Sequence, residues 1–421
     1  MSILIRQAKI IDPSSPFHSQ NADVFIEGDQ ISAIDLQLNL EADEIIDIPG
    51  LCISPGWVDI FAHFCDPGFE FKETIDTGAM AAATGGFTDI LLVPNTIPVV
   101  YTKGPVEYII QKSRSLLVNL HSIAAVTKNA EGNQLSEMYD MHQSGAIAFS
   151  DGLNTIQSPG ILLKALQYVK AINKTIIQLP DDHSINANGL MHEGIISTRL
   201  GLPGKPSIAE ELMIARDIEL VKYTRSKIHF TGVSTIKSIA LIASAKKEGL
   251  QVSCSVAPYH LLYTDEDLFD YDSNLKLNPP LRTKEDRQAL IQAVLNGTID
   301  CIASHHLPQD IDNKLVEFEN AKDGMIGLQT SFAIVKTAIP GISEDRLVEL
   351  FSTTARNIFH LPSASIKADH KACISLFLPG DPWSFTKDLN KSKSNNTSLF
   401  GKELYGRPLG IINKGSLFLN D

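Results

Sequence analysis

Eight polar residues stand where short apolar runs end, and their side chains could meet in one site. They are His63, Asn95, Asp151, Asp181, Ser234, His260, His305 and His306. Converging imidazole and carboxylate groups are what metal-assisted hydrolysis needs, because about three of them hold a zinc ion while another position stays open for water. These residue types therefore point first to hydrolysis at a metal centre.

The first apolar run, DIFAHFCDPG, supplies only half of a ligand pair. Alternate residues of a strand point the same way, so a His-x-His pair there would place two imidazoles on one metal. His63 occupies the second position, but Phe61 occupies the first. A phenyl ring has no lone pair to donate, so this strand offers one ligand at most.

The elements that must position these residues alternate between strand and helix patterns over residues 54–365. Apolar runs such as TDILLVPN and DCIASHHLP are followed by amphipathic segments such as GILLKALQYVKAIN. Continuous apolar strands alternating with helices indicate a parallel sheet covered on both faces. About eight such units fit a (β/α)₈ barrel, whose chemistry lies at the C-terminal ends of its strands.

Both ends of the chain have a different pattern. Residues 1–53 and 366–421 contain short runs in which apolar and polar residues alternate, with glycine and aspartate at the turns. This pattern predicts a small β-domain, sandwich-like, built from the two termini. Within it, the polar stretch near 387–400 predicts a loop, and its composition is typical of a mobile one.

Composition narrows the partners and the compartment. A net charge of −13 argues against nucleic acid or an anionic membrane, since either would select a basic surface. No apolar run approaches the roughly 20 residues needed to cross a bilayer, and the start lacks the apolar core of a signal peptide. Five scattered cysteines form no C-x-x-C pair. We expect a cytoplasmic protein.

The segment SPGWVDIFAHFCDPGFEFKETIDTGAMAAATGGFTDILLVPNT closely resembles the first-strand region of dihydroorotases. The resemblance continues through AFSDG, GLPGKPSIAEELMIARD, NPPLRTKEDRQALI, GTIDCIASHHLP and LYGRPLGIINKG, so it covers essentially the whole chain in order. Dihydroorotases are amidohydrolase-superfamily enzymes that interconvert carbamoyl-aspartate and dihydroorotate in pyrimidine synthesis. The resemblance implies the same barrel and terminal β-domain.

The same resemblance implies that most metal ligands have been replaced. The His-x-His-x-Arg of the first strand corresponds to Phe61, His63 and Cys65, so the arginine that binds the substrate carboxylate is also missing. The bridging carboxylate corresponds to Asp151. The remaining ligand positions are Leu179 on strand five, Gly232 on strand six and, in place of the aspartate that shuttles the proton on strand eight, His305.

Some substrate-side residues are retained. Asn95 in VPNT and Asn278 in NPPLR match the family, whereas the histidine that helps to hold the substrate corresponds to Gln309. With few ligands left, we expect no metal cofactor and a loss of the cyclic-amide hydrolase activity. The alternative is an active dihydroorotase, or a related cyclic-amide hydrolase, that holds one zinc ion through His63, Asp151 and His305.

What such a chain does follows from the resemblance alone. Some organisms carry inactive dihydroorotase-like chains that associate with aspartate carbamoyltransferase, and this sequence resembles them. We therefore expect a structural or regulatory partner of that enzyme. A homodimer is also consistent with the resemblance. A third hypothesis is a small-molecule binder that uses Asn95 and Asn278.

Overall fold

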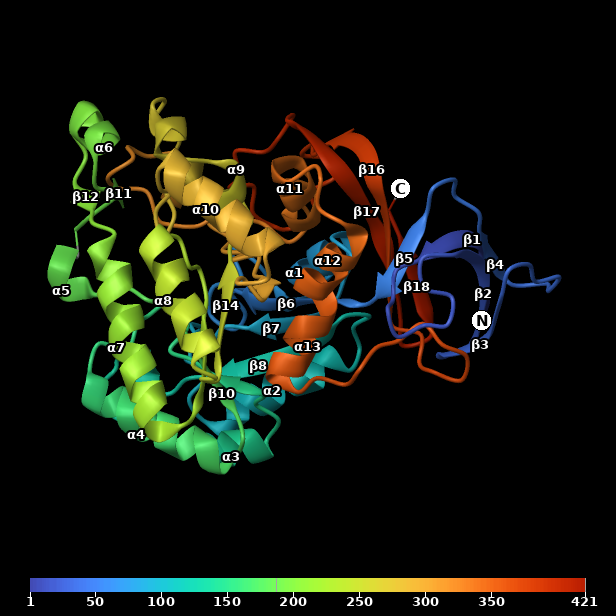
Figure 1. The fold of residues 1–421 in the computed structure, drawn as a ribbon, viewed down its shortest axis with the longest axis horizontal. Coiled ribbons are helices and arrows are strands. Elements are labelled where there is room, and N and C mark those ends of the chain that lie inside the picture. The colour runs from blue at the N-terminus through green and yellow to red at the C-terminus, as the bar shows by residue number, and fades with distance from the viewer. Residues whose placement is uncertain (187, 421) are drawn as a thin grey trace.

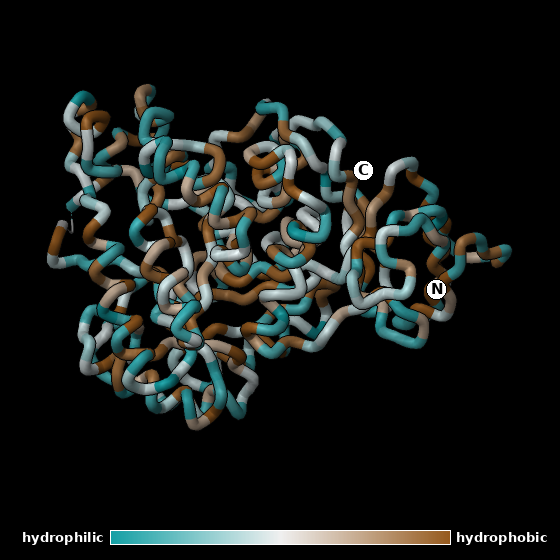
Figure 2. Tube along the Cα trace, in the orientation of Figure 1, coloured by the Kyte–Doolittle hydropathy of each residue, from teal (hydrophilic) through white to brown (hydrophobic). Residues whose placement is uncertain are grey.

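The computed structural model describes residues 1–186 and 188–420, and it consists of a barrel with a separate sheet beside it (Figure 1). The barrel strands are wrapped by helices, and both chain termini lie in the separate sheet. Hydrophobic segments run through the middle of the barrel and along this sheet (Figure 2). The predicted fold class, a (β/α)₈ barrel with a small β-domain from both termini, is confirmed.

Eight parallel strands make the barrel, and each pairs with the next in the order in which the chain lays them down. Their bounds are β6 (Trp57–Ala62), β7 (Phe87–Leu92), β8 (Asn119–Ala124), β9 (Ala148–Phe149), β10 (Thr175–Gln178), β13 (Lys227–Phe230), β14 (Val252–Val256) and β15 (Cys301–Ile302). The ring closes where Ala62 pairs with His306, and the amide of His63 donates to the carbonyl of His306 at 2.9 Å. The strand ends that carry His63 and His306 are thus neighbours.

Helices cover the outside of the barrel. They are α1 (Ile75–Thr84), α2 (Lys103–Ser113), α3 (Met138–Gln143), α4 (Pro159–Ala171), α7 (Ile208–Thr224), α8 (Ile236–Lys247), α10 (Lys284–Leu295), α11 (Ser331–Ala338), α12 (Glu344–Val348), η5 (Glu349–Thr353) and α13 (Thr354–Phe359). Helix α4 shows why they form. Ser158 caps its N-terminus, proline occupies the first turn, and Leu162, Leu166 and Val169 bury one face.

The terminal sheet follows the order β18-β17-β16-β5-β1-β2-β3, with β4 paired to β1. Its strands are β1 (Ser2–Ile10), β2 (Asn21–Glu27), β3 (Gln30–Asp35), β4 (Glu44–Ile46), β5 (Cys52–Pro55), β16 (Ile374–Ser384), β17 (Glu403–Asn413) and β18 (Ser416–Leu419). Its own core includes Ile3, Ile26 and Ile374. Trp57 joins the two parts, because its ring lies 4.7 Å from that of Phe332 and 5.3 Å from that of Phe377 on β16.

Short elements follow several barrel strands at the C-terminal face. They are η1 (Lys128–Ala130), α5 (His183–Asn186), β11 (Met191–His192), α6 (Ile195–Leu200), β12 (Gly204–Lys205), α9 (Tyr259–Leu262), η2 (Asp265–Leu268), η3 (Ser273–Leu275) and η4 (Ile311–Asn313). Strands β11 and β12 pair with each other outside the barrel. Among the residues that the structure describes, no helix is long and apolar enough to span a membrane.

The polar stretch at 387–400 forms a loop, as predicted, but it is packed against the barrel. Ser392, Ser394 and Asn396 are all buried. Asn396 donates to the carbonyls of Leu307 and Gly324, each at 3.0 Å. Its serine and asparagine side chains thus pair with buried backbone groups, which a polar composition alone does not predict.

Candidate functional site

A cavity of about 200 Å³ opens at the C-terminal ends of the barrel strands. Its lining includes Phe61, His63, Val93, Leu153, Leu179, Tyr259, His260, Leu277, Asn278, His305, His306, Leu307, Gln309, Lys322, Asp323 and Gly324. This is where a barrel of this kind carries its chemistry. Many of the predicted site residues therefore do meet at one place.

Three of the replaced ligand positions, Phe61, Leu179 and His305, line the cavity, and the fourth, Gly232, lies against two of them. The rings of Phe61 and His305 are tilted by 34° with centroids 4.8 Å apart. Gly232 has a positive φ of +68°, and a Cβ atom added there would lie 2.9 Å from Cε1 of His305 and 3.1 Å from Cδ1 of Leu179. Four positions that the resemblance assigns to metal thus pack against one another, and a side chain at Gly232 would not fit.

His63 uses both ring nitrogens within the protein. The backbone amide of Cys65 donates to Nδ1 at 2.8 Å, so the ring proton is on Nε2, which donates to the carbonyl of Asn95 at 2.9 Å. Burial lowers the pKa of His63 to about 4. The imidazole is neutral at pH 7, and its single lone pair is occupied by the backbone.

Asp151 is held by Thr127 and not by a histidine. The Thr127 amide donates to Oδ1 at 2.9 Å and its hydroxyl donates to Oδ2 at 2.5 Å. Burial raises the pKa of Asp151 to about 6 despite these bonds. Asn95 completes this corner, because its side-chain amide donates to the Asp151 carbonyl and accepts from the Leu153 amide.

These bonds leave little for a metal. His305 hydrogen-bonds the Thr231 hydroxyl through Nε2 at 2.8 Å, and burial lowers the pKa of His305 to about 3. Within residues 1–186 and 188–420, no three histidine, cysteine or carboxylate side chains are grouped so as to hold a metal ion. The donor set of His63, Asp151 and His305 therefore does not fit the zinc centre that the fold family implies. The expected absence of a metal stays a prediction.

The two asparagines predicted on the substrate side have different surroundings. Asn278 lines the cavity, and its side-chain oxygen accepts from Nζ of Lys205 at 3.1 Å. Lys205 also bonds Asp181 at 2.7 Å. Asn95, in contrast, is outside the cavity lining, and its side-chain amide donates to the Asp151 carbonyl in the loop after β9. Of the two, only Asn278 is placed to touch a ligand in the cavity.

Among the other predicted residues, some line the cavity and others do not. His260 lines the cavity and bonds the carbonyl of Pro279 through Nε2 at 3.1 Å, while its Nδ1 has no partner. Ser234 donates both its amide and its hydroxyl to buried Glu210, away from the cavity. Cys65 is buried beside His63, and burial raises the pKa of its thiol well above the usual range.

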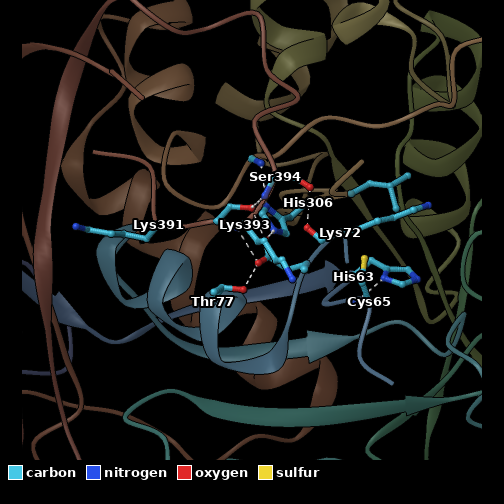
Figure 3. Close-up of polar contacts among 12 residues, drawn as sticks. His63, Cys65, Lys72, Thr77, His306, Lys391, Lys393 and Ser394 are labelled. Atoms are coloured by element: carbon cyan, nitrogen blue, oxygen red, sulfur yellow. Dashed lines mark hydrogen bonds and ion pairs between the residues drawn. The ribbon is translucent and has the colours of Figure 1, made fainter. Parts of the chain in front are cut away.

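One buried carboxylate was missed from the sequence. Glu73 accepts hydrogen bonds from Thr77, from Ser392 and, at 3.0 Å, from the Lys393 amide (Figure 3). It also pairs with Nε2 of His306 at 3.3 Å. Burial alone would raise the pKa of Glu73, but the bonds from His306, Ser392 and Thr77 outweigh it and hold this pKa below its usual value. Glu73 thus links the first and last barrel loops to the 387–400 loop.

Lys72 and Gln309 extend this link to the cavity rim. Nζ of Lys72 donates to the side-chain oxygen of Gln309 at 2.9 Å, and the Lys72 carbonyl accepts from Ser394 (Figure 3). The backbone amide of Gln309 donates to the side-chain oxygen of Asn396 at 3.0 Å. Gln309, at the position of a substrate-holding histidine, is therefore fixed by the loop packed over it.

The closed parallel barrel, the sheet from both termini and the cavity at the strand ends make up an amidohydrolase-type fold. Solved structures with this fold include L-hydantoinase (dihydropyrimidinase) from Arthrobacter aurescens, with a TM-score of 0.85 and 22% identity over 99% of this chain and 95% of that one. A D-hydantoinase (dihydropyrimidinase) from Thermus sp. has a TM-score of 0.81 and 19% identity over 100% and 95% of the two chains.

Sequence comparison identifies the family. Residues 50–238 match the model of the Dihydro-orotase-like family. Dihydroorotases from Syntrophus aciditrophicus and Aquifex aeolicus are each 35% identical, covering 99% and 100% of this chain and the same shares of their own lengths. The chain belongs to the dihydroorotase family. The names of these relatives favour the active alternative over a non-catalytic chain, although they say nothing of the donor atoms present here.

Proposed function

We propose that this chain is a dihydroorotase-family protein of pyrimidine biosynthesis that has lost metal-dependent hydrolysis. The observation that carries the proposal is the state of the three residual donors. The lone pair of His63 is bound by the Cys65 amide, both oxygens of Asp151 are bound by Thr127, and Nε2 of His305 is bound by Thr231.

The proton chemistry is altered as well. An aspartate at the position of His305 would be an anion able to take a proton from water, whereas the buried imidazole has its pKa lowered to about 3. The substrate carboxylate also lacks its clamp, because Cys65 stands in place of arginine and a buried thiol cannot form a bidentate ion pair. On this proposal the chain therefore lacks a metal site, a group to take the proton from water and the family's arginine that binds the substrate carboxylate.

The second candidate is an active dihydroorotase, which the names of the relatives support. It requires His63, Asp151 and His305 to converge on one zinc ion, and His63 to give up the hydrogen bond from the Cys65 amide that occupies its lone pair. Losing that bond would leave a buried amide without its partner, at about 1–3 kcal/mol. This cost is why we rank the active enzyme second.

An assay separates the two candidates. The purified chain is supplied with zinc and tested for hydrolysis of dihydroorotate and for cyclisation of carbamoyl-aspartate, with the Aquifex aeolicus dihydroorotase as the positive control. We expect no turnover above the uncatalysed rate. Turnover that is removed by a chelator and restored by zinc would establish the active enzyme instead.

We further propose that the chain acts as a structural or regulatory partner of aspartate carbamoyltransferase. The support for this is the resemblance to inactive dihydroorotase-like chains described above. Size-exclusion chromatography with light scattering, run on the chain alone and mixed with the carbamoyltransferase of the same organism, tests it. We expect a joint complex at micromolar concentration, whereas two species that elute separately would contradict the proposal.

A further inference from the structure

A continuous line of hydrogen bonds leads from the cavity into the interior of the barrel. Nε2 of His305 bonds the Thr231 hydroxyl at 2.8 Å, and the Ser255 hydroxyl donates to that of Thr231 at 3.0 Å. Ser255 also bonds Nε2 of His229 at 3.0 Å, and Nδ1 of His229 bonds the Ser253 hydroxyl at 2.9 Å. Five side chains are thus joined by four hydrogen bonds.

The strands explain why these side chains meet. On β13, Ile228 and Phe230 belong to the core between strands and helices, so His229 faces the barrel interior, as does Thr231 just beyond the strand end. On β14, Val252 and Cys254 belong to that same core, so Ser253 and Ser255 face inward. His229 and Ser253 are direct partners across the two strands.

Burial makes the line well defined. His229, Thr231 and Ser255 are each fully buried, so water does not compete for their hydrogen bonds. Along the line both imidazoles bond hydroxyl groups and not carboxylates, which favours the neutral ring with one N–H. Each hydroxyl has a single proton to give. If each of the four hydrogen bonds holds one proton and the Ser255 proton is used within the line, as burial without water favours, the protons run in one of two directions along it.

One direction uses every hydroxyl proton within the line. If Ser253 donates to His229, then His229 donates to Ser255, Ser255 to Thr231, and Thr231 to Nε2 of His305. In the opposite direction the Ser253 hydroxyl would have to donate to the Ile228 carbonyl. The distance between these two oxygens is 3.5 Å, which is longer than a normal hydrogen bond from a hydroxyl group. The first direction is also the one in which Ser255 is the donor to Thr231.

We propose that this line, from Ser253 through His229, Ser255 and Thr231, fixes His305 with its proton on Nδ1. The cavity is then offered an N–H donor at the position where the family has a carboxylate acceptor. A ligand would meet His305 through an acceptor oxygen, and the ring retains no lone pair for a cation. Thr231, Ser255 and His229 are positioning residues that act through His305.

The tautomer is read directly by nitrogen NMR. The full chain is labelled with ¹⁵N-histidine, and the His305 signals are assigned by their loss in His305→Gln or, should that variant not fold, in His305→Asn. We expect the wild-type spectrum at pH 7 to show His305 protonated on Nδ1 and unprotonated on Nε2. Protonation on Nε2 would overturn the proposal.

Two variants of one residue then test the line itself. Thr231→Val replaces the hydroxyl by a methyl group of similar volume, and we expect both His305 signals to move toward the values of a mixed tautomer. Thr231→Ser keeps the hydroxyl and should retain the wild-type signals. Ser122→Ala is the matched control, because the buried Ser122 hydroxyl has no hydrogen-bond partner.

A Thr231→Val spectrum identical to that of the wild type would overturn the role of the line. The same result in Ser122→Ala as in Thr231→Val would do so too, since any buried hydroxyl would then have the effect. The tautomer is measured without substrate or metal, so this proposal and the proposed loss of hydrolysis can fail independently.

Discussion

The ring of Phe61 lies against the imidazole of His305, with centroids 4.8 Å apart. These are residues of the first and last barrel strand ends, and in this family both positions are implied to serve the metals. Here an aromatic pair joins them. Phe61, Leu179 and His305 all line the cavity, and a Cβ atom added at Gly232 would lie 2.9 Å from the His305 ring.

Substitution of Gly232 tests how tightly these residues are packed. Gly232→Ala should lower the free energy of unfolding by about 1–3 kcal/mol more than Gly249→Ala, because overpacking adds to the backbone strain. Both glycines have positive φ, +68° and +77°, but a Cβ at Gly249 would meet nothing within 4 Å. Urea denaturation of the two variants measures the difference. Equal losses would mean that there is room for a side chain beside His305.

Removal of the Glu73 charge tests the attachment of the 387–400 loop. In Glu73→Gln the amide nitrogen replaces an oxygen that accepts from Ser392 or the Lys393 amide, so buried donors lose their partner. We expect a loss of about 1–3 kcal/mol in the free energy of unfolding. We also expect faster limited proteolysis within 387–400. The exposed Glu131→Gln is the control, and a Glu73 variant cleaved no faster than it would contradict this assignment.

The buried histidines make stability depend on pH. Burial lowers the pKa of His260 to about 4, below the roughly 6.5 of an unfolded histidine. The unfolded chain therefore binds this proton first, and stability that is full above pH 6.5 is lost as the pH falls toward 4. His260 should contribute a slope of about 1.4 kcal/mol per pH unit in that window.

The variant His260→Gln isolates that contribution. Its free energy of unfolding, measured by urea denaturation between pH 7 and 4.5, should fall less steeply with acid than that of the wild type. His370→Gln, at an exposed position, should follow the wild-type slope. If the free energy of unfolding fell equally steeply in His260→Gln and in the wild type, the pKa of His260 would be the same in the folded and the unfolded chain.

Much of the architecture could be predicted from local patterns. Apolar runs followed by amphipathic segments predict the barrel strands and helices, because burial on both faces requires that alternation. The placement of Phe61, Leu179 and His305 at one cavity follows from their positions at strand ends, whereas Asn278 reaches it from the loop between η3 and α10. The missing ligand at Phe61 can be predicted from the strand pattern, but the replacements at Leu179, Gly232 and His305 could be recognised only through the resemblance to dihydroorotases.

The partners of these side chains could not be predicted. Glu73 meets Ser392 across 319 residues of chain, and no local pattern encodes such a pairing. No pattern in the sequence indicates Lys205, yet it binds both Asp181 and Asn278. Asn95 was placed on the substrate side, but its hydrogen bonds go to the neighbouring loop. Each of these contacts depends on how loops that are distant in the sequence pack together.

Zinc analysis tests the proposal that this chain holds no metal where the resemblance places the family's ligands. The chain is purified, dialysed against micromolar zinc, freed of unbound metal and measured by atomic emission. We expect well under one zinc per chain, unchanged in His63→Gln. About one zinc per chain or more, lost in His63→Gln or in His305→Gln, would contradict it.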